Sequence, residues 1–309
     1  MKVSVIMPVE RLGGDAERAI DSVLRQQAPF DFELIAVSAA PLSLPPETGV
    51  RNVVEPNRNP ATRRNRAVSV AAGEILAFID DDATAEPRWL ATAVAYLDAH
   101  PDVLALGGPD PAPADSSVPE LFSDTLLATR WIGSGVLAHE DRDGVFAIEH
   151  PNDVALVNLF VRRSAFDGFD EAIGYIGEDT ALVERVMTRG RVIYHSGVRV
   201  HHRRRAFPGD YLTQRWRYRV KTGQMMTQPS YRANPKIKSF FAGAALMFFF
   251  FPVLAIPYYV GTLILGASAT RLPWRYWPLI PFAFAAHHVT YLVAIIWGAM
   301  AARLHRGRR

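Results

Sequence analysis

The 309-residue chain contains no cysteine, and it has two long stretches without charge near its carboxyl end. The absence of cysteine excludes disulfide bonds and metal sites with thiolate ligands. Asp, Glu, Lys and Arg are missing from residues 239–270 and again from residues 276–302. Each stretch is longer than the roughly 20 apolar residues that cross the hydrocarbon core of a bilayer. The sequence therefore predicts two transmembrane helices, at about 239–266 and 277–302.

Two buried core helices of a soluble domain are the alternative interpretation of these stretches. The run Phe248 to Phe251 and the aromatic residues within 274–277 favour lipid contact and an interfacial aromatic belt instead. Pro252 and Pro257 predict a kink in the first stretch, or a re-entrant segment.

Basic residues indicate how this hairpin is oriented. They lie before it in residues 232–238 and after it in residues 303–309, whereas the connection holds only Arg271 and Arg275. Both ends of the hairpin are therefore expected on the cytoplasmic side. The first residues read as a strand and lack a signal-peptide core. We expect residues 1–225 to form a cytoplasmic domain that ends in a basic interfacial segment, and residues 226–309 to form the membrane hairpin with its basic tail.

The first part of the chain alternates apolar stretches of strand length with helical periodicity. Overall, 49% of residues are hydrophobic and 21% are charged, and the formal net charge is +3. This composition is typical of a globular protein with few charged residues. Strands are expected at 3–9, 33–37, 50–54, 75–79 and 103–106, with helices that begin near Asp15, Pro60 and Pro87. This alternation predicts an α/β fold with a mostly parallel, doubly wound sheet.

Three consecutive acids, Asp80-Asp81-Asp82, directly follow the apolar strand 75–79. Such a strand delivers its last residues to the carboxyl edge of the sheet, where open α/β sheets bind ligands. Asp80 and Asp82 lie two positions apart, so on an extended chain both side chains can point the same way. Carboxylate oxygens in this arrangement suit Mg²⁺ or Mn²⁺ bound to a diphosphate. The alternative is a polar turn before the helix near Pro87.

The order of several motifs resembles a glycosyltransferase of family 2 over roughly residues 1–222. The matching segments are 3–9, 64–67, 72–82, Asn158 with 162–166, 168–171 and 177–182. The resemblance implies the GT-A nucleotide-sugar-binding fold, followed in this chain by two transmembrane helices. It also implies a hexosyltransferase that uses a nucleotide-sugar donor.

The resemblance assigns roles to particular residues. Asp179 is the implied general base, with Glu178 beside it; the alternative is a pair of acids at a helix N-terminus. The implied metal ligands are Asp80, Asp82 and His201, with His202 as the rival histidine. The residues implied at the donor are Pro8, Glu10, Ser38, Arg64, Asn65, Asp80 and Asp81.

Two of these positions depart from the family pattern. Ser38 stands where the family usually has an acidic residue near the nucleobase, and Glu10 stands where an aromatic residue is common. A serine hydroxyl can form a hydrogen bond but brings no charge. A UDP-sugar donor is favoured, and a GDP-sugar is possible.

The expected function is inverting, metal-dependent transfer of a sugar to a membrane-associated acceptor. A lipid-linked saccharide in polysaccharide or glycan assembly fits the hairpin best, and a polyprenyl phosphate is the alternative acceptor. A metal-dependent phosphohydrolase and a scaffold without catalytic activity are remoter alternatives. The Arg-rich segment 199–221 carries interleaved aromatic residues. We expect it to lie on membrane lipids and not to bind nucleic acid.

Overall fold

The computed structural model describes residues 1–130, 132–133, 136–173, 176–226 and 235–306. Backbone contacts divide the chain into two compact units, Met1–Ala114 with Val136–Arg203 and Asp115–Gly135 with Arg204–Arg309. These units are defined by backbone packing, whereas the expected boundary at residue 225 separates a cytoplasmic domain from a membrane hairpin. Backbone packing does not test that division. That boundary stays a prediction.

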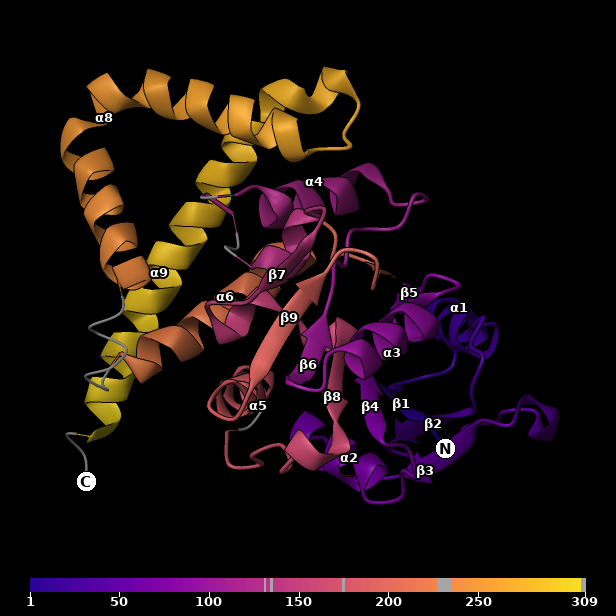
Figure 1. Cartoon of the computed structure of the whole chain (residues 1–309). Coiled ribbons are helices and arrows are strands. Elements are labelled where there is room, and N and C mark those ends of the chain that lie inside the picture. Colours follow the sequence, from indigo (N-terminus) through magenta and orange to yellow (C-terminus); the bar gives the residue numbers. More distant parts are fainter. Residues whose placement is uncertain (131, 134–135, 174–175, 227–234, 307–309) are drawn as a thin grey trace. The chain divides into compact units, whose positions relative to one another are not determined.

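The first unit contains an eight-stranded sheet in the order β3-β2-β1-β4-β8-β6-β9-β7 and a two-stranded sheet of β10 and β5 (Figure 1). The strands are β1 Val3–Pro8, β2 Phe32–Ser38, β3 Arg51–Val54, β4 Ile75–Phe78, β5 Ala83–Ala85, β6 Val103–Gly107, β7 Val145–Ala147, β8 Leu159–Arg162, β9 Arg191–His195 and β10 Val200–His202. β8 is antiparallel to β4 and β6, and β7 is antiparallel to β9. The other neighbouring pairs of the large sheet are parallel. The predicted α/β fold with a mostly parallel sheet is confirmed.

Helices and short 3₁₀ turns connect these strands. The α-helices of the first unit are α1 Gly14–Leu24, α2 Pro60–Val68, α3 Trp89–Ala99 and α5 Glu178–Met187. The 3₁₀ turns are η1 Pro46–Thr48, η2 Leu137–Glu140, η3 Pro151–Asp153, η4 Leu156–Asn158 and η5 Arg163–Ala165. The expected start of α2 at Pro60 is confirmed, and the Asn59 side chain caps it by accepting a bond from the Ala61 amide. Asp15 lies in the first turn of α1 and is not its cap, which is Gly13.

The large sheet separates two hydrophobic cores, because successive side chains of a strand point to opposite faces. Along β4, Ile75 and Ala77 belong to one core, whereas Leu76 and Phe78 belong to the other. The first core includes residues of α1 and α3, and the second includes residues of α2 and α5. Helices on both faces leave the strand ends as the place where polar loops gather, as the sequence predicts.

The second unit consists of helices. They are α4 Val118–Ala128, α6 Gly209–Met225, α8 Pro235–Ala269 and α9 Ile280–Arg306, with the 3₁₀ turn η6 Trp274–Leu279 before α9. Phe250 has non-helical backbone angles within α8, and Pro252 and Pro257 follow it. Figure 1 shows the resulting bend of α8. The kink expected from the two prolines is confirmed.

Two segments are long and apolar enough to cross a membrane, Lys238–Ala269 and Trp274–Leu304. Their mean hydropathies are 2.2 and 1.8. In the segment Lys238–Ala269, no part of the most apolar stretch is buried within the structure. In the segment Trp274–Leu304, 44% of the corresponding stretch is buried. The two apolar helices expected from the sequence are therefore present, and they differ in how far the rest of the chain covers them.

The Asn158 side chain supplies a test of the first unit's core. It is fully buried, accepts a hydrogen bond of 2.8 Å from the Trp89 indole, and donates bonds of 3.1 and 2.7 Å to the carbonyls of Pro109 and Val198. We expect Asn158→Ala to lower the free energy of unfolding by about 3 kcal/mol, because the buried Trp89 indole and Val198 carbonyl lose this hydrogen bond and the Pro109 carbonyl keeps only its bond from the Val200 amide. Urea denaturation followed by tryptophan fluorescence measures this change. Asn57→Ala, at an exposed turn, is the control and should change stability by less than about 1 kcal/mol; an equal effect of the two variants contradicts this account.

Candidate active site

The acidic run Asp80-Asp81-Asp82 fills the short connection between β4 and β5, at the carboxyl edge of the large sheet. Asp81 accepts a hydrogen bond of 2.9 Å from the backbone amide of Glu10, which follows β1. This bond joins the loops after two neighbouring parallel strands. The pKa of Asp81 is raised to about 6, chiefly by burial and also by the nearby charges of Asp82 and Asp80, while the hydrogen bond from Glu10 opposes the rise. The edge therefore concentrates negative charge, as the sequence predicts.

Arg64 joins this acidic loop to the start of α5. Its guanidinium lies 3.2 Å from Asp80 Oδ1 and 3.1 Å from Glu178 Oε1. The side chains of Arg64 and Glu178 are each only 9% exposed. Burial and the neighbouring Asp179 raise the pKa of Glu178, and Arg64 partly offsets that rise. One buried cation thus holds two carboxylates that lie far apart in the sequence.

Asp179 occupies the first turn of α5 and is more exposed than Glu178. Its carboxylate accepts a 2.7 Å hydrogen bond from the amide of Thr180. Gly177 precedes the helix with a φ of 99°, a left-handed conformation that glycine adopts without strain, and it turns the chain into α5. Glu178 and Asp179 are the two acids predicted at the catalytic site. Glu178 is paired with Arg64, and Asp179 is the more exposed of the two.

The two consecutive histidines of β10 point to different partners. In the antiparallel pair, His202 lies opposite Ala83 and His201 opposite Thr84. His202 Nε2 lies 3.2 Å from Asp82 Oδ1, whereas His201 Nε2 lies 3.4 Å from Glu86 Oε1. The structure therefore brings His202, and not the expected His201, to Asp82, because the pairing with β5 decides which residue faces the acidic loop.

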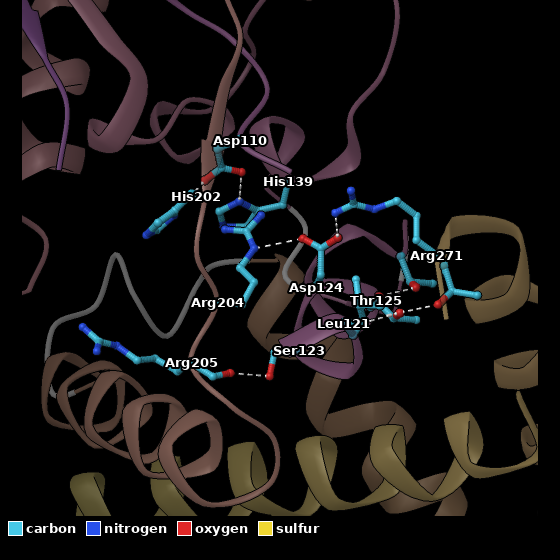
Figure 2. Close-up of polar contacts among 12 residues, drawn as sticks. Asp110, Leu121, Ser123, Asp124, Thr125, His139, His202, Arg204, Arg205 and Arg271 are labelled. Carbon is cyan, nitrogen blue, oxygen red and sulfur yellow. Dashed lines mark hydrogen bonds and ion pairs between the residues drawn. The ribbon is translucent and has the colours of Figure 1, made fainter. Parts of the chain in front are cut away.

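Asp110 and His139 extend this contact and were not predicted from the sequence. Asp110 is fully buried; its Oδ2 lies 3.5 Å from His202 Nδ1 and its Oδ1 lies 2.7 Å from His139 Nδ1 (Figure 2). Backbone bonds from Val200 and His202 to the carbonyls of Pro109 and Pro111 hold the start of this loop against β10. A lone Asp in a stretch rich in Pro and Ala gives no local signal of such a role.

The other residues expected at the donor fall into two groups. Pro8 ends β1 and Glu10 follows it, with the exposed Glu10 carboxylate 2.9 Å from Arg63 Nη1; both lie at the same edge as Asp81. Ser38 is buried, and its hydroxyl donates to the Ala40 carbonyl at 2.7 Å and accepts from Asn52 at 2.9 Å.

Asn65 is engaged in the same way as Ser38, with the protein itself. Its side chain exchanges hydrogen bonds of 2.8 and 2.9 Å with the backbone of Phe169 and donates one of 2.9 Å to Glu171. Ser38 and Asn65 therefore support neighbouring segments, and their roles toward a donor stay predictions.

Among the described residues, no group of three or more His, Asp or Glu side chains has the arrangement of a metal site. Asp82 and His202 nevertheless present a carboxylate oxygen and an imidazole nitrogen on one side of the acidic loop. Mg²⁺ and Mn²⁺ are commonly bound by one or two protein ligands together with substrate phosphates, and not by a complete protein cage. The donor set fits a cation of this kind held jointly by the protein and a diphosphate.

The chain is similar to a known protein family. The family described as glycosyl transferase family 2 matches residues 4–135. These residues include β1, β4, the acidic loop and Arg64. The chain therefore carries a domain of glycosyltransferase family 2.

One curated relative and two solved structures are similar to this chain. The glucosyl-dolichyl phosphate glucuronosyltransferase of Haloferax volcanii is 28% identical over 158 residues, which are 48% of this chain and 48% of the relative. The chain thus matches about half the length of that relative. The mannosyltransferase PcManGT of Pyrobaculum calidifontis, solved with GDP-Man and Mn²⁺, is 22% identical with a TM-score of 0.51, covering 94% of this chain and 87% of its own. TarS of S. aureus, residues 1–349, is 16% identical with a TM-score of 0.48, covering 100% of this chain and 92% of its own. The fold is GT-A.

A double-mutant cycle tests whether Arg64 and Glu178 depend on each other. We expect Arg64→Met alone to destabilise the protein by about 3 kcal/mol, because it leaves a buried carboxylate without its cation. Glu178→Gln should recover part of that loss in the double variant, with a coupling energy of about 1.5 kcal/mol or more. The exposed pair Arg191–Asp102, whose side chains are 52% and 57% exposed, is the control and should couple by less than about 0.5 kcal/mol. Equal coupling in the two pairs contradicts the account.

Proposed function

We propose that this chain transfers a sugar, with inversion at the anomeric carbon, from a nucleotide-sugar donor to a membrane-associated lipid-linked saccharide. The observation that carries the proposal is the bridge from Asp80 through Arg64 to Glu178. It fixes the start of α5, with Asp179, beside the acidic loop after β4. A general base and a diphosphate-binding loop are the two parts that such a transfer requires at one site.

The donor side of the proposal rests on the acidic loop and the family match. The match of residues 4–135 and the GT-A neighbour solved with GDP-Man support a nucleotide-sugar donor. A UDP-sugar remains the favoured donor, and a GDP-sugar is kept as the second because Ser38 brings no charge to the nucleobase side. We assign Pro8, Glu10, Arg64, Asp80 and Asp81 to this side. Hydrolysis assays with a panel of nucleotide sugars decide between the two nucleobases.

Asp82 and His202 would hold a Mg²⁺ or Mn²⁺ ion. When bound, the cation neutralises charge that develops on the departing diphosphate. The assignment of His202 replaces that of His201, because His202 lies 3.2 Å from Asp82.

Asp179 then performs the proton transfer. Its carboxylate accepts the proton of the acceptor hydroxyl, whose oxygen forms the new bond to the anomeric carbon. The bond from that carbon to the diphosphate oxygen breaks on the opposite face, and the nucleoside diphosphate leaves with the bonding electrons. Attack opposite to the leaving group inverts the configuration. Glu178, paired with Arg64, keeps α5 in place and takes no proton in this scheme.

The acceptor assignment rests on the exposed apolar helices and on the curated relative. The relative is, by its name, a glucuronosyltransferase that acts on a glucosyl-dolichyl phosphate, which is a lipid-linked saccharide. The described part of α8 exposes large apolar side chains, which supports an acceptor in a membrane and a role in polysaccharide or glycan assembly. A polyprenyl phosphate is the second acceptor. The catalytic unit and both termini are proposed to lie on the cytoplasmic side.

A metal-dependent phosphohydrolase is less well supported. It would need a cluster of ligands that activates water, and the described residues hold none with three His, Asp or Glu side chains. A scaffold without catalytic activity is also less well supported. Such a protein would not need the Arg64 bridge to hold Asp179 beside the acidic loop.

The role of Asp179 as base predicts a specific kinetic change. Asp179→Asn should lower kcat by about 10²-fold or more, because the amide cannot accept the proton, while nucleotide binding stays within a few-fold. Steady-state assays and calorimetry measure the two quantities. Glu184→Gln, an exposed acid on the same helix, is the control and should leave both unchanged. A variant at Asp179 with near-normal kcat would move the base elsewhere, with Glu178 as the first alternative.

The two histidines of β10 form a matched pair for testing the cation site. With UDP or GDP present, His202→Ala should weaken Mn²⁺ binding by about 10-fold or more in a calorimetric titration, and Asp82→Ala should weaken it at least as much. His201→Ala, whose imidazole lies 3.4 Å from Glu86, should leave Mn²⁺ affinity nearly unchanged. The opposite ranking of the two histidine variants would return the ligand role to His201.

A further inference from the structure

The turn between the two apolar helices is bound to α4. Arg271 Nη2 lies 3.1 Å from Asp124 Oδ2, and the Thr270 hydroxyl lies 2.6 Å from that of Thr125. Leu272 is buried in a cluster with Phe122 and other residues of α4, α6 and α9.

Asp124 also pairs at 2.9 Å with Arg204, whose side chain is 3% exposed (Figure 2). An ion pair, a hydroxyl contact and an apolar cluster therefore fix the same turn to the same helix.

The position of α4 in the chain limits where this turn can lie. Only residues 115–117 join α4 to the first unit on one side, and only residues 129–135 do so on the other. Fully extended, these segments reach about 10 Å and about 25 Å. Neither spans the roughly 30 Å of a hydrocarbon core. Helix α4 must therefore remain on the side of the membrane that holds the first unit, and the turn bound to it must remain there too.

Helix α9 is held to the same set of helices along its length. Near its start, Phe284 packs in the cluster with Phe122, and further along His287 Nδ1 lies 2.7 Å from the Tyr211 hydroxyl of α6. Toward its end, a Cβ added at Gly298 would collide with the Val220 carbonyl, so α6 and α9 touch through their backbones.

Helix α6 cannot accompany α9 through a bilayer. It carries the charged residues Asp210, Arg215, Arg217, Arg219 and Lys221, and charges of this number are too costly within hydrocarbon. The second half of α9 therefore lies along the charged helix α6, and its first half is tied to α4 and α6 through the apolar cluster and the Tyr211–His287 contact.

Helices α8 and α9 both expose apolar side chains, among them Phe282 and Trp297 of α9, and the most exposed ones lie in α8. Phe248, Phe249 and Val253 are 80%, 74% and 73% exposed around the bend at Phe250. The helical parts before and after the bend, 235–249 and 251–269, are about 22 and 28 Å long at 1.5 Å per residue. Trp274, 80% exposed, and Arg275 follow in η6, and such residues are typical of the headgroup level. The surface thus combines an apolar bend with an interfacial aromatic and basic turn.

We propose that α8 and α9 enter the membrane from one side only, as an in-plane insertion. The exposed face of α8 occupies the acyl-chain region of a single leaflet, and the turn 270–273 lies on the same side as the first unit. This arrangement replaces the membrane-spanning hairpin that hydropathy alone predicts. It does not depend on the sugar chemistry proposed above, so either can fail without the other.

The absence of cysteine allows a direct test on the full-length chain in sealed vesicles. Single-cysteine variants Trp274→Cys at the turn and Ser69→Cys at an exposed site of the first unit are treated with a membrane-impermeant maleimide before and after detergent is added. In-plane insertion predicts that both cysteines are labelled from the same face. Labelling of Trp274→Cys only from the face opposite to Ser69→Cys overturns the proposal.

A cross-linking experiment tests the same point without relying on reagent access. The double variant Thr125→Cys with Thr270→Cys places two thiols where two hydroxyls lie 2.6 Å apart. Oxidation of the membrane-inserted protein should give an intramolecular disulfide as readily as the control pair Asn152→Cys with Thr180→Cys, whose side-chain oxygens lie 2.7 Å apart in the first unit. A disulfide in the control pair and none between residues 125 and 270 overturns the proposal.

Discussion

The arrangement of the candidate site depends on the buried guanidinium of Arg64. Two acidic segments meet at the carboxyl edge of the sheet, one after β4 and one at the start of α5, and their carboxylates would repel each other in a medium of low dielectric. Arg64 lies between Asp80 and Glu178 and compensates both. Because α2 carries Arg64, these two ion pairs connect α2 to the loop after β4 and to the start of α5. The accessible acid Asp179 takes its position from this bridge, and the proposed division of roles between Glu178 and Asp179 follows from it.

A second bridge organises the helical unit by the same principle. Asp124 lies between Arg204 and Arg271, and its side chain is 8% exposed. Such a group is costly to bury unless it is paired, so the two arginines and the segments that carry them are drawn to α4. In the first unit the central charge is a cation between acids, and in the second it is an acid between cations. Each bridge joins segments that no local sequence pattern connects.

Much of the fold follows from local patterns, whereas the site needs pairings that sequence does not encode locally. Strand lengths, the start of α2 and the acidic loop after β4 are visible because hydrophobic alternation and Pro60 are local signals. Which of His201 and His202 faces Asp82 depends on the register of β10 against β5. A shift of this register by one residue would exchange the two histidines. Asp110 and His139 meet only through folding. Hydropathy identifies α8 and α9 as apolar, but it cannot predict that Gly298 of α9 lies against Val220 of α6.

The central claim is that a nucleotide-sugar donor binds at the edge formed by the acidic loop, Arg64 and β10. A crystal structure of the full chain with Mn²⁺ and a nucleoside diphosphate tests it most directly. The account predicts the diphosphate and the cation beside Asp82 and His202, with Asp179 facing the place of the anomeric carbon. A nucleotide bound at another part of the chain, or a cation coordinated without Asp82, would contradict it.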